Sequence, residues 1–319
     1  MIVTVTPAPA IDWTVRVEDF ALGAVNRVVA SEREPSGKGV NVSWALRRAG
    51  VPTRAVLPAG GHSGALMTAA LTRAGVEHVV VDTGREVRTN ITLVAGGTST
   101  KINDTPGALT SAQGQALRAA ACRAAADADV VLVCGSLPPG VAAHWVRDLV
   151  RALHRPGLDV VVDSSGPALA LALQAGPSLV KPNVAELAEL TGRQIATFAD
   201  VVDAAQVARD RGAGAVLASL GPDGAMLVDH DGALWAQARD IPFRNSVGAG
   251  DALLAGFLST EGPPARRLST ATLWASSAVA HATTLFPIRP ELAERITLGP
   301  IPSTRRLREP GAPLQPAPA

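Results

Sequence analysis

Apolar and polar residues alternate in blocks along the second half of the chain, and the blocks predict strands and helices in turn. Short runs rich in β-branched residues predict strands at 130–133, 159–163, 179–180 and 215–219, with a neighbouring strand at 225–228. Apolar residues at helical spacing predict helices at 142–154, 168–175, 184–191 and 200–211. Strands separated by such helices form a parallel sheet covered on both faces, which binds ligands at the carboxyl ends of its strands.

The first third of the chain has a different pattern, in which apolar and polar residues alternate singly. The segments 14–33 and 88–103 follow it, for example in Thr-Asn-Ile-Thr-Leu-Val at 89–94. A period of two is typical of strands with one apolar and one polar face. We therefore expect lid strands at about 13–33 and 87–104, which form a small sheet over a site.

Together these patterns predict an α/β fold with a doubly covered, mostly parallel central sheet and a small β-strand lid. We expect a single domain over residues 1–298, with the lid strands inserted in it. From residue 299 the chain is rich in Pro and Arg, and it ends in Pro-Gly-Ala-Pro-Leu-Gln-Pro-Ala-Pro-Ala. Because such a segment has little apolar surface to bury, we expect a disordered tail over 299–319.

Composition excludes several classes of protein. Of the 319 residues, 47% are hydrophobic, which indicates a globular chain. No apolar run reaches the roughly 18 residues that span a membrane, and no basic segment precedes the first apolar residues as in a secretory signal. A formal net charge of +1 gives no reason to bind nucleic acid or acidic lipid. Cys122 and Cys134 are too few for a disulfide framework, so we expect a cytoplasmic protein without nucleic-acid or membrane partners.

The sequence Asn-Ser-Val-Gly-Ala-Gly-Asp at 245–251, followed directly by an apolar helical run, is the most informative motif. Gly248 and Gly250 allow a tight turn and a close approach of the backbone to a ligand. The first amides of the helix have no intrahelical partner and, with the helix dipole, form a site for an anion such as phosphate. Asp251 would repel that phosphate unless it accepts the proton of an attacking hydroxyl. The motif therefore predicts a phosphotransferase, with a simple helix cap at Asp251 as the alternative.

A second motif, Ser-Gly-Lys-Gly-Val-Asn at 36–41, also leads into a helical run. Its glycines allow close approach of the backbone, and Lys38 and Asn41 add one cation and one amide. It is not a P-loop, because no Gly lies five residues before the Gly-Lys pair and neither Ser nor Thr follows Lys38. Alone, this motif is equally consistent with a structural turn at the start of a helix.

These two motifs, in this order and with Ala-Pro-Ala-Ile-Asp at 8–12, resemble those of the ribokinase/PfkB family of sugar kinases. Further matches follow in order: Gly-Gly-His-Ser-Gly at 60–64, Arg-Thr-Asn at 88–90, Gly-Ser-Leu-Pro-Pro-Gly at 135–140, Asp-Ser-Ser at 163–165, Lys-Pro-Asn at 181–183 with Glu186, and Ser-Leu-Gly-Pro-Asp-Gly at 219–224. The resemblance covers about residues 1–297. It is strongest to the hexose-phosphate branch, which includes 1-phosphofructokinase and tagatose-6-phosphate kinase. It implies a ribokinase-like fold.

The resemblance also implies a role for each matching residue around the transferred phosphoryl group. Asp251 would be the general base, and Gly248, Ala249 and Gly250 would provide the amides that surround the phosphoryl group. Other matching residues would bind the sugar, Asp12 by accepting hydrogen bonds from its hydroxyls. The substrate-binding residues implied in this way are Asp12, Gly37, Lys38 and Asn41.

ATP and Mg²⁺ are the cofactors that the resemblance implies. Asn183 and Glu186 would hold Mg²⁺ through waters, as expected for an ion that retains its hydration. Ser219, Gly221 and Gly224 would form a turn against the phosphates and ribose of the nucleotide, with Asn183 as a further nucleotide-binding residue. A helix at about 269–283 would flank the adenine.

The substrate class depends on cations, because a sugar phosphate carries about two negative charges and is best bound by Arg. Arg88 and Lys101 in the lid segments, together with Lys38, are suitable, and Asn103 completes this substrate-binding set. We expect an ATP-dependent kinase of a ketohexose phosphate, with fructose 1-phosphate as the first candidate and tagatose 6-phosphate as the second. A kinase of an unphosphorylated sugar or nucleoside and a non-catalytic sugar-phosphate sensor stay open as alternatives. The resemblance also suggests a homodimer formed through the lid.

Several of these residues also have a purely structural interpretation. Asp12 and Asp163 can be turn residues at strand ends, and Glu186 can be an exposed residue on a helix face. Arg88 and Lys101 can be solvated charges of the lid.

Three positions depart from the usual family pattern, namely Ala8, Ser36 and Asn245. Asn245 and the segment 285–290 lie where many relatives bind a monovalent cation, so dependence on such a cation is left open. The change at Ala8 concerns sugar specificity and leaves the prediction of phosphoryl transfer intact.

Overall fold

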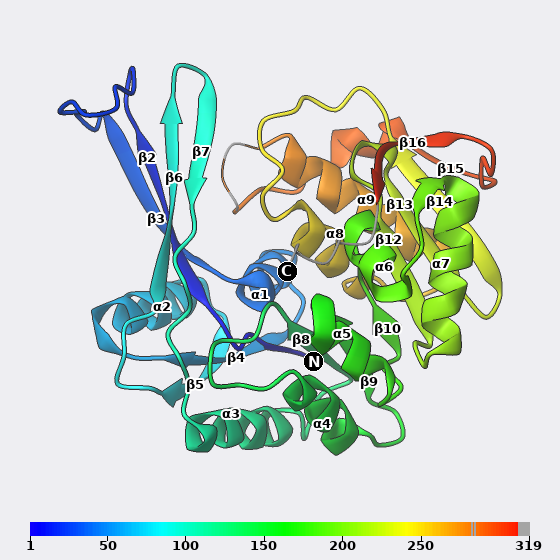
Figure 1. Ribbon diagram of the computed structural model, residues 1–319, viewed down its shortest axis with the longest axis horizontal. Helices are drawn as coiled ribbons and strands as arrows, with labels where there is room; N and C mark the ends of the chain where they lie inside the picture. Colours follow the sequence, from blue (N-terminus) through cyan, green and yellow to red (C-terminus); the bar gives the residue numbers. More distant parts are fainter. Residues whose placement is uncertain (282, 284, 312–319) are drawn as a thin grey trace, which may run out of the picture.

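A ten-stranded sheet forms the centre of the computed structural model, which describes residues 1–281, 283 and 285–311 (Figure 1). All neighbours from β12 to β5 run parallel, and β13, β14 and β15 are antiparallel to their neighbours. In spatial order the strands are β15 (Ile296–Gly299), β14 (Gly232–Ala238), β13 (Ala225–Asp229), β12 (Ala215–Ser219), β10 (Leu179–Val180), β9 (Asp159–Asp163), β8 (Val130–Cys134), β1 (Ile2–Val5), β4 (Thr53–Ala59) and β5 (Glu77–Asp82).

Alternate residues of the central strands point into two separate hydrophobic clusters, one on each face of the sheet. In β1, Val3 and Val5 belong to one buried cluster and Ile2 to the other. In β8, Val131 lies in the first cluster and Leu132 in the second. Successive side chains of a strand point to opposite faces, so these near-continuous apolar runs are buried on both sides. This confirms the predicted doubly covered, mostly parallel sheet.

Helices cover both faces of this sheet (Figure 1). The first cluster contains residues of α3 (Ser111–Ala124), α4 (His144–Leu153), α5 (Gly166–Leu173), α6 (Val184–Thr191) and α7 (Phe198–Asp210). The second contains residues of α1 (Lys38–Arg48), α8 (Ala249–Leu258) and α9 (Pro264–Val279). A third cluster joins α2 (Gly61–Arg73) to α1 and β4. Within the described ranges, no helix is long and apolar enough to cross a bilayer.

Side-chain caps explain where two of the predicted helices begin. Asn183 caps α6 by accepting the Glu186 amide, and the Glu186 carboxylate accepts the Asn183 amide in return. Thr197 and Asp200 form the same capping box, so α7 begins at Phe198, two residues before the predicted start. The predicted adenine-side helix is α9, which ends at Val279 instead of continuing to 283. Two short 3₁₀ helices, η1 (Gly221–Asp223) and η2 (Pro290–Arg295), complete the helical elements among the described residues.

A four-stranded sheet forms the lid and projects from the main body at the upper left of Figure 1. The central pair, β2 and β6, is parallel, and each has an antiparallel neighbour. The predicted lid sheet is therefore confirmed. The predicted lid segment 13–33 is not strand throughout, because residues 17–29 form a connection between two strands. In this connection, the side chain of Asn26 bonds the backbone of Ala21. The order is β3 (Ala30–Ser36), β2 (Ala10–Arg16), β6 (Arg88–Ala95) and β7 (Thr98–Ile102).

The disorder predicted from residue 299 onward is wrong for residues up to 311, and 312–319 lie outside the described residues. Gly299 ends β15, and β16 (Arg306–Gly311) pairs antiparallel with β11 (Ile195–Thr197). Leu307 is buried in the first cluster, and a buried carboxylate at Asp223 pairs with Arg305 and Arg308. These tertiary contacts order a segment whose composition alone favours disorder.

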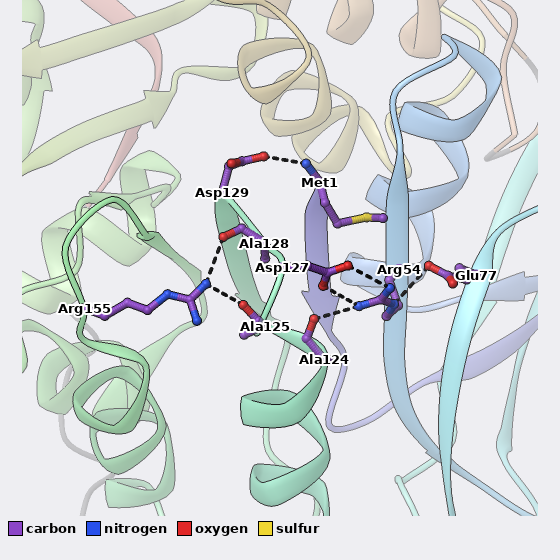
Figure 2. A network of polar contacts seen from close by, with 9 residues as sticks. All are labelled: Met1, Arg54, Glu77, Ala124, Ala125, Asp127, Ala128, Asp129 and Arg155. Carbon is purple, nitrogen blue, oxygen red and sulfur yellow. Dashed lines mark hydrogen bonds and ion pairs between the residues drawn. The ribbon is translucent and has the colours of Figure 1, made fainter.

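A network of polar contacts lies at the amino ends of the central strands (Figure 2). Arg54 on β4 donates to Asp127, and Arg155 donates to two carbonyls of the same connection, residues 125–129 between α3 and β8. The amino-terminal ammonium group of Met1 pairs with Asp129 at 2.5 Å. The network therefore holds this connection at the sheet edge opposite to the carboxyl ends of the strands.

Candidate active site

Four charged side chains from distant parts of the chain lie at the carboxyl ends of the central strands. Lys38 opens α1, Asp163 ends β9, Lys181 follows β10, and Asp251 lies in the first turn of α8. Lys38 Nζ donates to Asp163 Oδ1 at 2.8 Å, and Lys181 Nζ lies 3.3 Å from Asp163 Oδ2. This is the edge at which parallel sheets bind their ligands.

Asp251 is buried in surroundings that favour its protonated form. The residue is 8% exposed, and its Oδ2 accepts a hydrogen bond from Asn41 Nδ2 at 2.8 Å. Burial and the negative charge of Asp163 raise the pKa of Asp251 to about 6, although Asn41 and two lysines oppose the shift. A carboxyl group with such a pKa can accept a proton near neutral pH. The side chain caps no amide of the described backbone, which argues against a simple cap.

The amino end of α8 presents unpaired amides beside this carboxylate. Gly248 adopts a left-handed conformation with φ of 77°, which Gly tolerates best, and the helix begins directly after it. Within the described residues, the amides of Gly250 and Asp251 have no acceptor, whereas the amide of Ala249, also predicted to bind the phosphoryl group, already donates to the Ser246 carbonyl at 3.3 Å. A Cβ at Gly250 would lie 3.4 Å from Lys181 Nζ, so an ammonium group lies beside the amides. Amides, helix dipole and ammonium together form a site suited to an anion.

Asp163 is fully buried between two ammonium groups. Its side chain is 1% exposed, and that of Lys181 is 5% exposed. Burial by itself would lower the pKa of Lys38. The negative charges of Asp163 and Glu186 together have a larger effect, so the pKa of Lys38 is raised above its ordinary value. The sequence left the role of Asp163 open, and the structure makes it the centre of this cluster.

Sequence reasoning missed Lys181 as a member of the site. The sequence did contain a signal for it, since Lys181 directly follows the apolar pair of β10. A Lys at the end of a buried strand requires a charged partner.

Two glycines bring the start of α1 against β1. A Cβ at Gly37 would lie 2.9 Å from Thr6 Cγ2, and one at Gly39 would lie 2.4 Å from Thr6 Oγ1. Gly37 also has a φ of 119°, which side chains rarely adopt. This close approach places Lys38 and Asn41 at the sheet edge, while direct binding of substrate by Gly37 remains a prediction.

Asp12 is held between two neighbours of the lid sheet. Its carboxylate accepts a hydrogen bond from Ser36 Oγ at 2.7 Å and one from Asn90 Nδ2 at 3.0 Å. Asp12 lies directly opposite Asn90 in the parallel pair of β2 and β6. Ser36, one of the departures from the family pattern, thus orients the predicted sugar-binding carboxylate.

Arg88 lies at the base of the lid and is partly buried. It donates to the carbonyls of Asp104 and Ala8 at 3.1 and 3.3 Å. Burial lowers the pKa of Arg88, although Asp12 and Asp104 oppose the effect. Because these acceptors are neutral carbonyls, they do not neutralise the guanidinium group, and its positive charge remains available to an anionic ligand.

Lys101 lies further out along the lid than Arg88, and Asn103 directly follows the same strand, β7. Both are exposed, and Lys101 on β7 lies opposite Thr92 of β6. Thr92 is about 13 Å further along β6 than Arg88, from the usual rise per strand residue. Their substrate-binding roles therefore remain predictions.

Buried polar atoms without a partner gather around this site. In the described part of the chain, Asn41 Oδ1, Asn90 Oδ1 and Arg88 Nε have no hydrogen-bond partner. Folded proteins leave few buried polar atoms unpaired, so such atoms at a sheet edge suggest a ligand. An acceptor in Asn41 suits a hydroxyl, and a donor in Arg88 suits a phosphate. Asn90 is a second residue of the site for which the sequence alone indicated no role.

A hollow of about 1230 Å³ lies beside the amino end of α8. Its wall contains all four residues predicted to bind nucleotide, Asn183, Ser219, Gly221 and Gly224, together with Ala249 and Gly250. Residues of α9 line it as well, which agrees with the expected position of the adenine-side helix. The hollow therefore joins the predicted nucleotide residues to the predicted anion site.

Asn183 and Glu186 bond each other in the capping box of α6. The side-chain oxygens that the box leaves unused determine how well each residue suits Mg²⁺. The Glu186 carboxylate uses Oε2 in the cap, and its Oε1 lies 4.0 Å from Lys38 Nζ. One carboxylate oxygen therefore remains for an ion that prefers oxygen ligands and retained waters. Glu186 fits the ion, whereas the Oδ1 of Asn183 is already used in the cap.

Comparison with known proteins shows similarity over nearly the whole chain. A model of the pfkB family of carbohydrate kinases matches residues 2–293. A 1-phosphofructokinase of Haloferax volcanii is 38% identical over 81% of this chain and 83% of that protein. A D-tagatose-1-phosphate kinase of Klebsiella oxytoca is 30% identical over 81% of this chain and 85% of that protein.

A solved structure shows the same architecture. Phosphofructokinase-2 of Escherichia coli, in complex with fructose-6-phosphate, aligns with a TM-score of 0.82 at 29% identity. The alignment covers 87% of this chain and 93% of that one. The ribokinase-like fold expected from the sequence is thereby confirmed.

Proposed function

Because the chain belongs to the pfkB family of carbohydrate kinases, we propose that it transfers the terminal phosphoryl group of ATP to fructose 1-phosphate and forms fructose 1,6-bisphosphate. Membership makes it a phosphotransferase that acts on a sugar hydroxyl, with ATP as the donor. The finer statement, the identity of the acceptor, rests on the relatives and on the charge of the acceptor side. The roles given to single residues below belong to the proposal.

The main observation behind the proposal is the raised pKa of Asp251 beside the unpaired amides of α8. The carboxylate of Asp251 can accept a proton, and the amides at the start of α8 can hold a phosphate. Transfer of a phosphoryl group to a hydroxyl needs both functions within reach of one another.

In the proposed reaction, the sugar hydroxyl oxygen attacks the terminal phosphorus of ATP while Asp251 accepts the hydroxyl proton. The new bond joins that oxygen to phosphorus, and the bond from phosphorus to the bridging oxygen breaks, so that ADP leaves. The amides of Gly250 and Asp251 donate to the oxygens of the transferred group. Lys181, whose Nζ lies beside Gly250, offsets the negative charge that these oxygens bring.

Lys38 and Asp163 keep this cation in place. Asp163 binds both ammonium groups, so neither lysine can turn toward solvent without leaving a buried carboxylate less paired. The positive charge is therefore organised before ATP arrives, which reduces the reorganisation needed during transfer.

Mg²⁺ is part of the proposal, with Glu186 as its carboxylate and waters between them. When bound, the ion would neutralise charge on the donor phosphates. Asn183 would act by capping α6 and holding Glu186 in position.

The acceptor side favours a phosphorylated sugar. Arg88 has carbonyl acceptors and a buried Nε without a partner in the described structure, which suits an anionic group. Asp12, oriented by Ser36 and Asn90, suits the sugar hydroxyls. Tagatose 6-phosphate is the second candidate, and an unphosphorylated sugar or nucleoside is a third that needs no Arg88.

Release of ADP by the purified protein, measured over a panel of acceptors, tests the proposal. The panel contains fructose 1-phosphate, fructose 6-phosphate, tagatose 1- and 6-phosphates, fructose, ribose and adenosine. The highest kcat/KM is expected for fructose 1-phosphate. Binding of ATP without turnover on any acceptor would favour a non-catalytic sensor, and turnover of only neutral acceptors would refute the sugar-phosphate assignment.

The predicted homodimer through the lid remains a proposal, supported by apolar side chains that the lid exposes. The largest exposed fractions in its connection 17–29 are 93% for Leu22 and 82% for Val25. Light scattering would test it, since Leu22→Asp with Val25→Asp should convert a dimer to a monomer. The cytoplasmic location likewise stays a prediction from the sequence.

A further inference from the structure

The last described strand of the chain reaches the wall of the nucleotide hollow. β16 lies beyond residue 293, where the family match ends, and pairs with β11. Its residues Arg308 and Glu309, with Arg305 just before it, line the same hollow as Ser219 and Gly221. Residues outside the matched region thus lie at the predicted donor site.

A buried carboxylate fastens this strand to the nucleotide turn. Asp223 ends η1 and has a fully buried side chain. It accepts hydrogen bonds from Arg305 Nη2 at 2.6 Å and from the Arg308 amide at 2.7 Å. An unpaired carboxylate is costly in such a place, so the strand stays attached to the turn that contains Gly221.

The two arginines are not equivalent. Arg305 lies over the rings of Phe198 and Trp235, 5.2 and 5.7 Å from their centroids, and pairs closely with Asp223. Arg308 has a side chain that is 60% exposed, and its Nε lies 3.5 Å from Asp223 Oδ1. Arg305 therefore completes the packing, while most of the Arg308 guanidinium group can bind another anion.

We propose that Arg308 binds a phosphate of the donor nucleotide, so that the carboxyl-terminal strand forms part of the ATP site. This inference rests on the proposed function, because it takes the hollow between Ser219 and Gly250 as the donor site. Asp223 acts as the positioning residue, since it fixes both the backbone and the Nε of Arg308. A guanidinium group held in this way matches the oxygens of a phosphate.

Glu309 sets a limit on where the phosphate lies. A Cβ at Gly221 would lie 2.6 Å from Glu309 Oε2, so this carboxylate lies against the nucleotide turn. It repels a phosphate at Gly221 itself and leaves the Arg308 side as the favourable position. Glu309→Gln is therefore expected to strengthen ADP binding.

Calorimetric titration of the full chain with ADP and with adenosine tests the role of Arg308. Arg308→Ala should raise the Kd for ADP on the order of tenfold, the usual effect of losing a charged hydrogen bond, and leave the Kd for adenosine unchanged. Arg308→Lys should recover part of the ADP affinity. Arg306→Ala, an exposed Arg on the same strand that does not line the hollow, is the control and should match wild type.

The outcomes separate this inference from the proposed function. Wild-type affinity of Arg308→Ala for ADP would overturn the inference while the kinase assignment stands. Equal losses for ADP and adenosine would show that Arg308 acts only through the structure of the strand, which also overturns it. Failure of the wild-type protein to bind ADP would instead refute the donor site on which both rest.

Discussion

Asn41 Nδ2 donates to Asp251 Oδ2 at 2.8 Å, although the two residues are 210 positions apart in the sequence. The bond joins the starts of α1 and α8, which lie on the same face of the central sheet. It holds the proposed base in one orientation and favours its ionised form, against burial and the charge of Asp163. The balance of these effects leads to several of the following predictions.

Asp251→Asn should lower kcat by roughly 10³-fold or more, because the amide cannot accept the hydroxyl proton. The substitution keeps the size of the side chain and its hydrogen bond from Asn41. Steady-state kinetics with fructose 1-phosphate would measure the effect, and a near-normal kcat would identify Asp251 as the wrong base.

The same substitution should make the fold slightly more stable at neutral pH. A folded-state pKa of about 6 exceeds the ordinary Asp value, so the native state binds more protons between about pH 4 and pH 6, and stability falls as pH rises through that range. Asp251→Asn removes the carboxylate, and with it this loss of folding stability. Urea unfolding at pH 5 and pH 8 would show a larger gain at pH 8, because only part of the loss has occurred at pH 5.

The pH dependence of kcat/KM should show an acid limb near pH 6, below which protonated Asp251 cannot act as a base. Asn41→Ala removes a hydrogen bond to the charged form, so the pKa of Asp251 rises and the limb moves to higher pH. Asn90→Ala is the control, since it should weaken sugar binding without moving the limb. An unchanged limb in Asn41→Ala would contradict this account.

Arg88→Ala should raise the KM for a sugar phosphate by about 10- to 100-fold, the usual range for a lost charged contact to phosphate. Turnover of a neutral sugar, if any is detectable, should not change. Arg16→Ala, at an exposed position further along the same lid sheet, should have little effect. Equal losses in the two variants would mean that the lid acts through its general charge.

Lys181→Met should lower kcat on the order of 10²-fold, by analogy with the removal of one group that stabilises transition-state charge. Met fills nearly the same volume but leaves Asp163 with Lys38 alone. Thermal unfolding would show whether the variant is folded, and Arg73→Met, at an exposed position of α2, would serve as a control. A folded variant with normal kcat would assign Lys181 a structural role only.

Arg54→Ala should lower the free energy of unfolding by about 1–2 kcal/mol through loss of its charged hydrogen bonds. Its contacts lie at the amino ends of the strands, away from the proposed site, so kcat and KM should not change (Figure 2). Arg27→Ala, exposed in the lid connection, is the matched control. A drop in kcat with an unchanged unfolding midpoint would contradict this separation of stability from activity.

The sequence by itself determined the class of the fold, since apolar runs such as 130–133 and 159–163 can be buried only in a sheet covered on both faces. It also determined the local geometry at the starts of α6 and α8, because caps and glycines act through the neighbouring backbone.

Only the tertiary structure decided which charges meet. Lys181 faces Asp163, Ser36 orients Asp12, and Lys101 lies apart from Arg88, and none of these relations is local in sequence. The ordered segment up to 311 has the same explanation, since Asp223 holds it from more than 80 positions away. Local pattern cannot show such pairings, because burial of a charge depends on the packing of segments that are distant along the chain.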